Sequence, residues 1–89
     1  MALTATMKVT LTEEDIQAGL ASDPWKCPLC LALGRAFGGV VTVAPGAFML
    51  GWGEGVIGRL PPQAEEWRER FDAGKAVRPL EFQVEDPRQ

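Results

Sequence analysis

The stretch "PLCLALGRAF", residues 28–37, has one charged residue and is otherwise apolar or small. Pro28 suits a first helical turn, and Gly38 can close a helix in the left-handed conformation, so the stretch predicts a helix that starts around Cys27. Apolar side chains cover nearly the whole circumference of this helix, and such a helix must be buried on more than one side. We expect it to lie at the centre of the fold.

The segment before this helix carries a strand pattern and a helix start. "MKVTLT" (residues 7–12) alternates apolar and polar residues, as a half-buried strand does. Thr12 then has the chemistry of an N-cap, and the acids of "EED" (13–15) favour the positive end of a helix. We expect a short helix that passes through Leu20 and stops near "SDP" (22–24).

The segment after the central helix consists of short β-branched and aromatic runs separated by glycine and proline turns. We expect strands at "VVTVA" (40–44), "AFMLGW" (47–52) and "VIGRL" (56–60), a helix at "QAEEWRERFDAG" (63–74) and a last strand at "PLEFQVE" (79–85).

These elements together predict an α+β fold. A small, mainly antiparallel sheet of about four or five strands packs against the buried central helix, and two further helices complete the cover. We expect residues 7–85 to form a single domain, with flexible termini at 1–6 and 86–89.

The size and charge of the chain restrict its classes of function. The 89 residues carry a formal net charge of −3, with twelve acids against nine bases and no cluster of Lys and Arg, so no nucleic-acid partner is expected. The N-terminus lacks the pattern of a signal peptide, and no apolar run approaches the length of a membrane span. We therefore expect a soluble cytoplasmic protein without a membrane partner.

Metal ligands are scarce in this sequence. A structural zinc site takes four ligands, and the chain offers two cysteines and no histidine. We expect neither a metal nor a cofactor. A zinc ion shared across a dimer, or held with the help of acids, is the alternative.

The stretch "WKCPLC", residues 25–30, has the composition of a thiol–disulfide site. Cys27 at a helix N-terminus would have a lowered thiol pKa, and "TVAP" (42–45) superficially resembles the cis-proline segment of glutaredoxins. The topology argues against that fold, because a turn rather than a strand precedes Cys27, and twelve residues (42 − 30) leave no room for the intervening elements. We favour Cys27 as a helix-start residue and Cys30 as a small core residue.

Two further patterns suggest chemistry by their letters alone. "GEGVIG" (53–58) matches G-x-G-x-x-G, but no helix opens within it, so its glycines indicate a hairpin turn and a close strand approach. The acids lie at helix caps and on solvated faces, and no histidine is present to activate a nucleophile. We therefore expect no enzyme.

Three tryptophans raise the question of an interface, because tryptophan is enriched at binding hot spots. Trp67 has helical spacing with Phe71 and is predicted to be core. Trp25 lies in a turn and Trp52 beside a hairpin, so these two, with Arg59, are our interface candidates. The alternative is that each tryptophan folds over an edge of the core.

Three stretches, "KVTLTEEDI", "CPLCLAL" and "LPPQAEEWRERFDAGKAVRPLEFQV", together resemble a group of small proteins encoded by tailed bacteriophages and prophages. The resemblance covers most of residues 7–84. It implies a small cytosolic phage product made to bind a host or phage protein. It also implies an apolar residue at the position of Cys30 in many relatives, and it carries over no catalytic residue.

We expect a non-enzymatic protein that binds or modulates a host or phage protein, for example as an inhibitor made during infection. The alternative from another class is a thiol–disulfide oxidoreductase, with Cys27 as nucleophile and Cys30 as resolving thiol. A homodimer is a third hypothesis, because the all-apolar central helix has a surplus face that a small monomer must cover.

Overall fold

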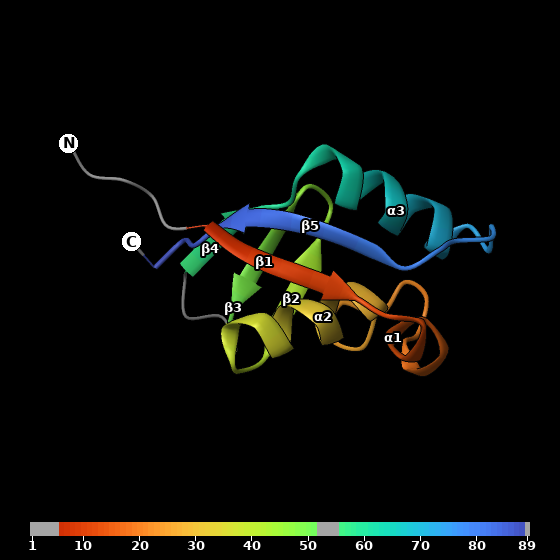
Figure 1. The fold of residues 1–89 in the computed structure, drawn as a ribbon, viewed down its shortest axis with the longest axis horizontal. Coiled ribbons are helices and arrows are strands. Elements are labelled where there is room, and N and C mark those ends of the chain that lie inside the picture. Colours follow the sequence, from red (N-terminus) through yellow and green to blue (C-terminus); the bar gives the residue numbers. More distant parts are fainter. Residues whose placement is uncertain (1–5, 52–55, 89) are drawn as a thin grey trace.

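The computed structural model describes residues 6–51 and 56–88, which form an α+β fold (Figure 1). Its elements in chain order are β1 (Thr6–Leu11), α1 (Glu13–Ala18), α2 (Pro28–Phe37), β2 (Val41–Ala44), β3 (Ala47–Leu50), β4 (Val56–Arg59), α3 (Pro62–Asp72) and β5 (Leu80–Glu85).

The strands form two antiparallel sheets rather than one. β1 and β5, from opposite ends of the chain, make a two-stranded ribbon, and β2, β3 and β4 make a meander. In the ribbon, Val9 pairs with Phe82 and all its buried side chains share one face, while Lys8 and Glu81 form an ion pair on the other. α1 and α2 lie along the β1 edge of the ribbon and α3 along its β5 edge (Figure 1).

The predicted central helix is confirmed. Cys27 is its N-cap, Pro28 opens its first turn, and Gly38 closes it with a φ of 75°. Its side chains pack against β1, α1 and β2 of the same chain. The fully buried or nearly buried members are Pro28, Leu29, Cys30, Ala32 and Leu33.

α1 begins as predicted and ends earlier. The Thr12 hydroxyl accepts the Asp15 N–H, and the Asp15 carboxylate accepts the Thr12 N–H, which completes a capping box. The helix stops at Ala18, before the predicted Leu20. The backbone of Gly19 is extended, with φ of −78° and ψ of 156°, and it lies so close to the ring of Pro28 that a Cβ atom there would overlap it.

α3 covers the ribbon with Ala64 and Trp67, which are buried. The ring of Trp67 stacks on Phe71 at 5.3 Å, and its Nε1–H donates to the carbonyl of Arg78 at 2.7 Å. The prediction that Trp67 belongs to the core is confirmed.

Within the described residues, contacts extend one residue before and up to three residues beyond the predicted domain of residues 7–85. Thr6 already pairs with Glu85 in the ribbon. Beyond β5, Arg88 binds the Asp86 carboxylate and lies 5.2 Å from the centre of the Phe37 ring. Within residues 6–51 and 56–88, no helix has the length and apolar character needed to cross a membrane.

Candidate functional site

The loop between α1 and α2, residues 19–27, has a backbone fixed by its own hydrogen bonds. The N–H of Leu20 donates to the carbonyl of Lys26 at 2.8 Å and so closes the loop. Inside it, Asp23 Oδ1 accepts the N–H groups of Trp25 and Lys26, each at 2.9 Å. This is an Asx-type turn, in which a short acidic side chain satisfies the backbone that follows it.

Contacts to two other elements hold the same loop in place. The N–H of Ser22 donates to Asp72 Oδ1 on α3 at 2.9 Å. The carbonyl of Pro24 accepts the N–H of Val43 on β2 at 2.9 Å. The start of α2 is therefore positioned by α3 and β2 as well as by its own capping.

The two cysteines meet at this helix start. Cys27 is the N-cap and Cys30 is one turn further on, and their Sγ atoms lie 3.0 Å apart as free thiols. The N–H of Cys30 donates to the Sγ of Cys27 at 3.4 Å, and the Cys30 thiol also reaches the carbonyl of Pro24 at 3.0 Å. Both side chains are buried, with 4% of each residue exposed, so the prediction that Cys30 is a core residue is confirmed.

The surroundings shift the pKa values of the two thiols in opposite directions. The hydrogen bond from the Cys30 thiol lowers the pKa of Cys27 below its usual range, outweighing burial and the Asp72 carboxylate, and the N–H groups of Leu29 and Cys30 act in the same direction. The same contact and burial raise the pKa of Cys30 far above its usual range. Cys27 therefore loses its proton first.

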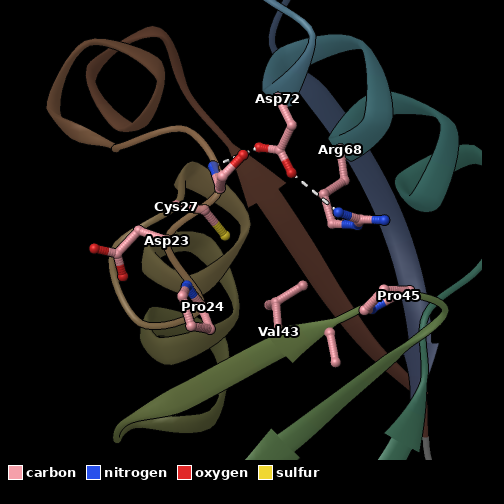
Figure 2. Close-up of a pocket in the computed structure, with 9 residues that line it drawn as sticks. Asp23, Pro24, Cys27, Val43, Pro45, Arg68 and Asp72 are labelled. Carbon is pink, nitrogen blue, oxygen red and sulfur yellow. Dashed lines mark hydrogen bonds and ion pairs between the residues drawn. The ribbon is translucent and has the colours of Figure 1, made fainter.

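A pocket of about 350 Å³ adjoins Cys27 (Figure 2). The Cys27 sulfur points toward the space enclosed by the loop, β2 and α3 (Figure 2). Three charged side chains line it beside apolar ones, and Arg68 forms ion pairs with both Glu65 and Asp72. The lining residues are Ser22, Asp23, Pro24, Cys27, Val43, Ala44, Pro45, Arg68 and Asp72.

The structure places the predicted interface residues in different parts of the molecule. Trp25 is half-exposed, at 50%, and shares its loop with Leu20, which is 51% exposed and which the sequence had not singled out. Arg59 is exposed on β4, where it borders a separate hollow of about 200 Å³ with Pro61 and residues 83–85. Trp52 lies outside the described residues. The structure thus places Trp25 and Arg59 on different elements and different hollows.

The structure accounts for one glycine of the "GEGVIG" pattern. Gly58, the last glycine of "GEGVIG", packs against the Phe48 ring so closely that a Cβ atom would overlap it, as the expected close strand approach requires. Residues 53–55 of the pattern lie outside the described residues. In the part of the chain that the structure describes, no group of three or more Cys, Asp and Glu side chains is arranged to hold a metal ion.

No protein-family model, no curated protein and no solved structure matches this chain. The resemblance to phage-encoded proteins therefore stays a prediction, and the chemistry of the site rests on its own residues.

Proposed function

We propose that this chain is a non-enzymatic binding protein that contacts another protein through the loop of residues 19–26, hereafter the Trp25 loop. The observation that carries the proposal is that Trp25 and Leu20, both about half-exposed, belong to one hydrogen-bonded loop. Tryptophan is among the side chains most enriched at the energetic hot spots of protein interfaces.

The rigidity of the Trp25 loop matters for affinity. Binding costs free energy when a loop must be ordered, and a loop that is already fixed avoids much of that cost. Here the Asp23 carboxylate fixes the turn at Trp25, and Ser22 is tied to Asp72. The backbone that carries Trp25 is therefore already fixed before binding.

The charge of the chain indicates what the partner surface looks like. The net charge is −3, and Glu13 and Glu14 are exposed on α1, which leads directly into the Trp25 loop. A complementary partner is a protein with an apolar recess bordered by Lys and Arg side chains. Such charge complementarity speeds association and makes it sensitive to salt.

The resemblance of the sequence to phage-encoded proteins supports a specific setting. We place the chain in the cytoplasm of an infected bacterium, where it would bind and modulate a host or phage protein. The absence of a histidine from the sequence supports binding over acid–base catalysis.

The packing of α2 bears on the homodimer hypothesis. A single copy already covers α2 with β1, α1 and β2, and its side chains from Pro28 to Leu33 are mostly buried. The surplus apolar face that favoured a dimer is thus occupied within one chain. We propose that one copy binds the partner, with light scattering expected to give a mass near 9.7 kDa.

Affinity capture from a bacterial lysate tests the proposal with three baits: the unaltered chain, Trp25→Ala and Ile57→Ala. Ile57 is the matched control, because it is 60% exposed but lies on β4. A partner retained by the unaltered chain and by Ile57→Ala, and depleted at least about tenfold by Trp25→Ala, supports the proposal. A lysate that yields no partner, or one retained equally by all three baits, contradicts it.

A further inference from the structure

We infer that Cys27 and Cys30 form a reversible dithiol–disulfide couple that reacts with a small-molecule disulfide admitted through the pocket beside Cys27. This goes beyond the proposed binding function and does not depend on it. Three structural observations carry the inference: the contact between the sulfur atoms, the unequal access of the two thiols to the pocket, and the polar lining of that pocket.

The contact between the thiols is close enough for a disulfide to form with little rearrangement. Their Sγ atoms lie 3.0 Å apart, and a disulfide bond requires roughly 2.0 Å. Cys27 is the N-cap: its backbone is extended, its N–H donates to the loop carbonyl of Asp23 at 3.2 Å, and its carbonyl accepts the Leu31 N–H of α2 at 3.2 Å. The missing distance can therefore be closed by side-chain rotation and a small shift of the loop.

The access of the two thiols is unequal. Both residues are 4% exposed, but Cys27 lines the pocket, whereas Cys30 is not among the lining residues and its thiol reaches the Pro24 carbonyl at 3.0 Å. An incoming disulfide thus meets Cys27 first. The lowered pKa of Cys27 and the raised pKa of Cys30 favour the same order, because the thiolate is the attacking species.

The pocket suits a small polar disulfide rather than a folded protein. Its volume of about 350 Å³ is at the lower end of small-molecule sites. The lining carries the guanidinium of Arg68, which is already paired with Glu65 and Asp72, and a further carboxylate, Asp23, so it can accept a ligand that has both carboxylate and ammonium groups. Amino-acid-derived disulfides carry both groups, and glutathione disulfide is the readily used member of this class.

The exchange has two steps. The Cys27 thiolate attacks one sulfur of the small disulfide RSSR, forming a Cys27–SR mixed disulfide and releasing RS⁻. Cys30 then loses its proton to solvent and attacks the Cys27 sulfur, which forms the Cys27–Cys30 bond and releases a second RS⁻. The protein loses two electrons and two protons, and RSSR becomes two RSH after protonation.

The chain is well suited to a test because these are its two cysteines. The folded, fully reduced protein is incubated with glutathione disulfide at pH 7.5 without denaturant and followed by intact mass. We expect the unaltered chain to lose the mass of two hydrogen atoms. We expect Cys30→Ser to accumulate one glutathionyl group and Cys27→Ser to react at least about tenfold more slowly.

Circular dichroism of each variant checks that it is folded, and the result for the unaltered chain does not depend on any variant. Two outcomes overturn the inference. One is an unaltered chain that stays reduced until denaturant is added, as inert core thiols would. The other is a mixed disulfide on the unaltered chain that Cys30 never resolves.

Discussion

The guanidinium of Arg35 on α2 binds both carboxylate oxygens of Asp15 on α1, with Nη1–Oδ1 at 3.1 Å and Nη2–Oδ2 at 2.7 Å. The same Nη2 donates to the carbonyl of Thr10 at the end of β1. Asp15 is also part of the capping box with Thr12. The Asp15–Arg35 pair therefore joins the first strand, the first helix and the central helix.

Replacing Arg35 by Gln should lower the free energy of unfolding by about 1–3 kcal/mol, because it leaves the buried Asp15 carboxylate without its cation. The matched control is Arg59→Gln, which removes an exposed arginine from β4. That change should stay within about 0.5 kcal/mol. Urea denaturation of both variants measures the difference, and equal losses would show that the Asp15–Arg35 pair is not a structural link.

The same pair should make stability depend on acid. Burial acts to raise the pKa of Asp15, but hydrogen bonds from Arg35 and from the Thr12 N–H outweigh it and hold this pKa below its usual range. A carboxylate with a lowered folded-state pKa stabilises the fold above its unfolded value, near ~3.9, and this contribution is lost as pH falls through the folded value. Unfolding measured from pH 6 to pH 2 should therefore show a steeper loss for the unaltered chain than for Arg35→Gln. If the stabilities of the two proteins fell in parallel with pH, the acid dependence would not come from the Asp15–Arg35 pair.

Gly58 on β4 should not tolerate a side chain. A Cβ atom there would overlap the Phe48 ring, so Gly58→Ala should destabilise the chain by about 1–3 kcal/mol through overpacking of the core. Gly39 is the control glycine, because a Cβ atom added there meets nothing within 4 Å. Thermal unfolding of the two alanine variants separates the effects, and a Gly58→Ala variant as stable as Gly39→Ala would disprove the close approach.

The charge of Asp72 should control the reactivity of Cys27. Asp72 raises the pKa of that thiol, against the larger lowering effect of the Cys30 thiol. Asp72→Asn removes the charge while its amide oxygen can still accept the Ser22 N–H, so alkylation of Cys27 should become faster at a given pH below 8. Glu69→Gln makes the same kind of change one turn away on α3, at an exposed position. Identical iodoacetamide rates for the two variants would argue against the electrostatic account.

Local signals in the sequence predicted the helices well. Pro28 and Gly38 bracket α2 at the predicted places, and Thr12 caps α1, because each acts on the backbone within one turn. The early end of α1 was not predictable from local signals. Gly19 is extended at this point and lies against the ring of Pro28, a contact that no local pattern shows.

Long-range relationships could not be predicted in the same way. The pairing of β1 with β5 joins opposite ends of the chain, and so the division into two sheets does not appear in any single segment. The pocket beside Cys27 likewise combines the Trp25 loop, β2 and α3. The closeness of the two thiols, in contrast, could be predicted from the sequence. Cys27 and Cys30 are three residues apart at a helix start, and residues at i and i+3 share a helix face.

The most direct test of the binding proposal is amide hydrogen exchange on the captured partner complex. The account predicts slower exchange in residues 19–26 on binding, with little change in β4, where the second candidate, Arg59, lies. Protection confined to β4 and β5, with the Trp25 loop unchanged, would contradict it.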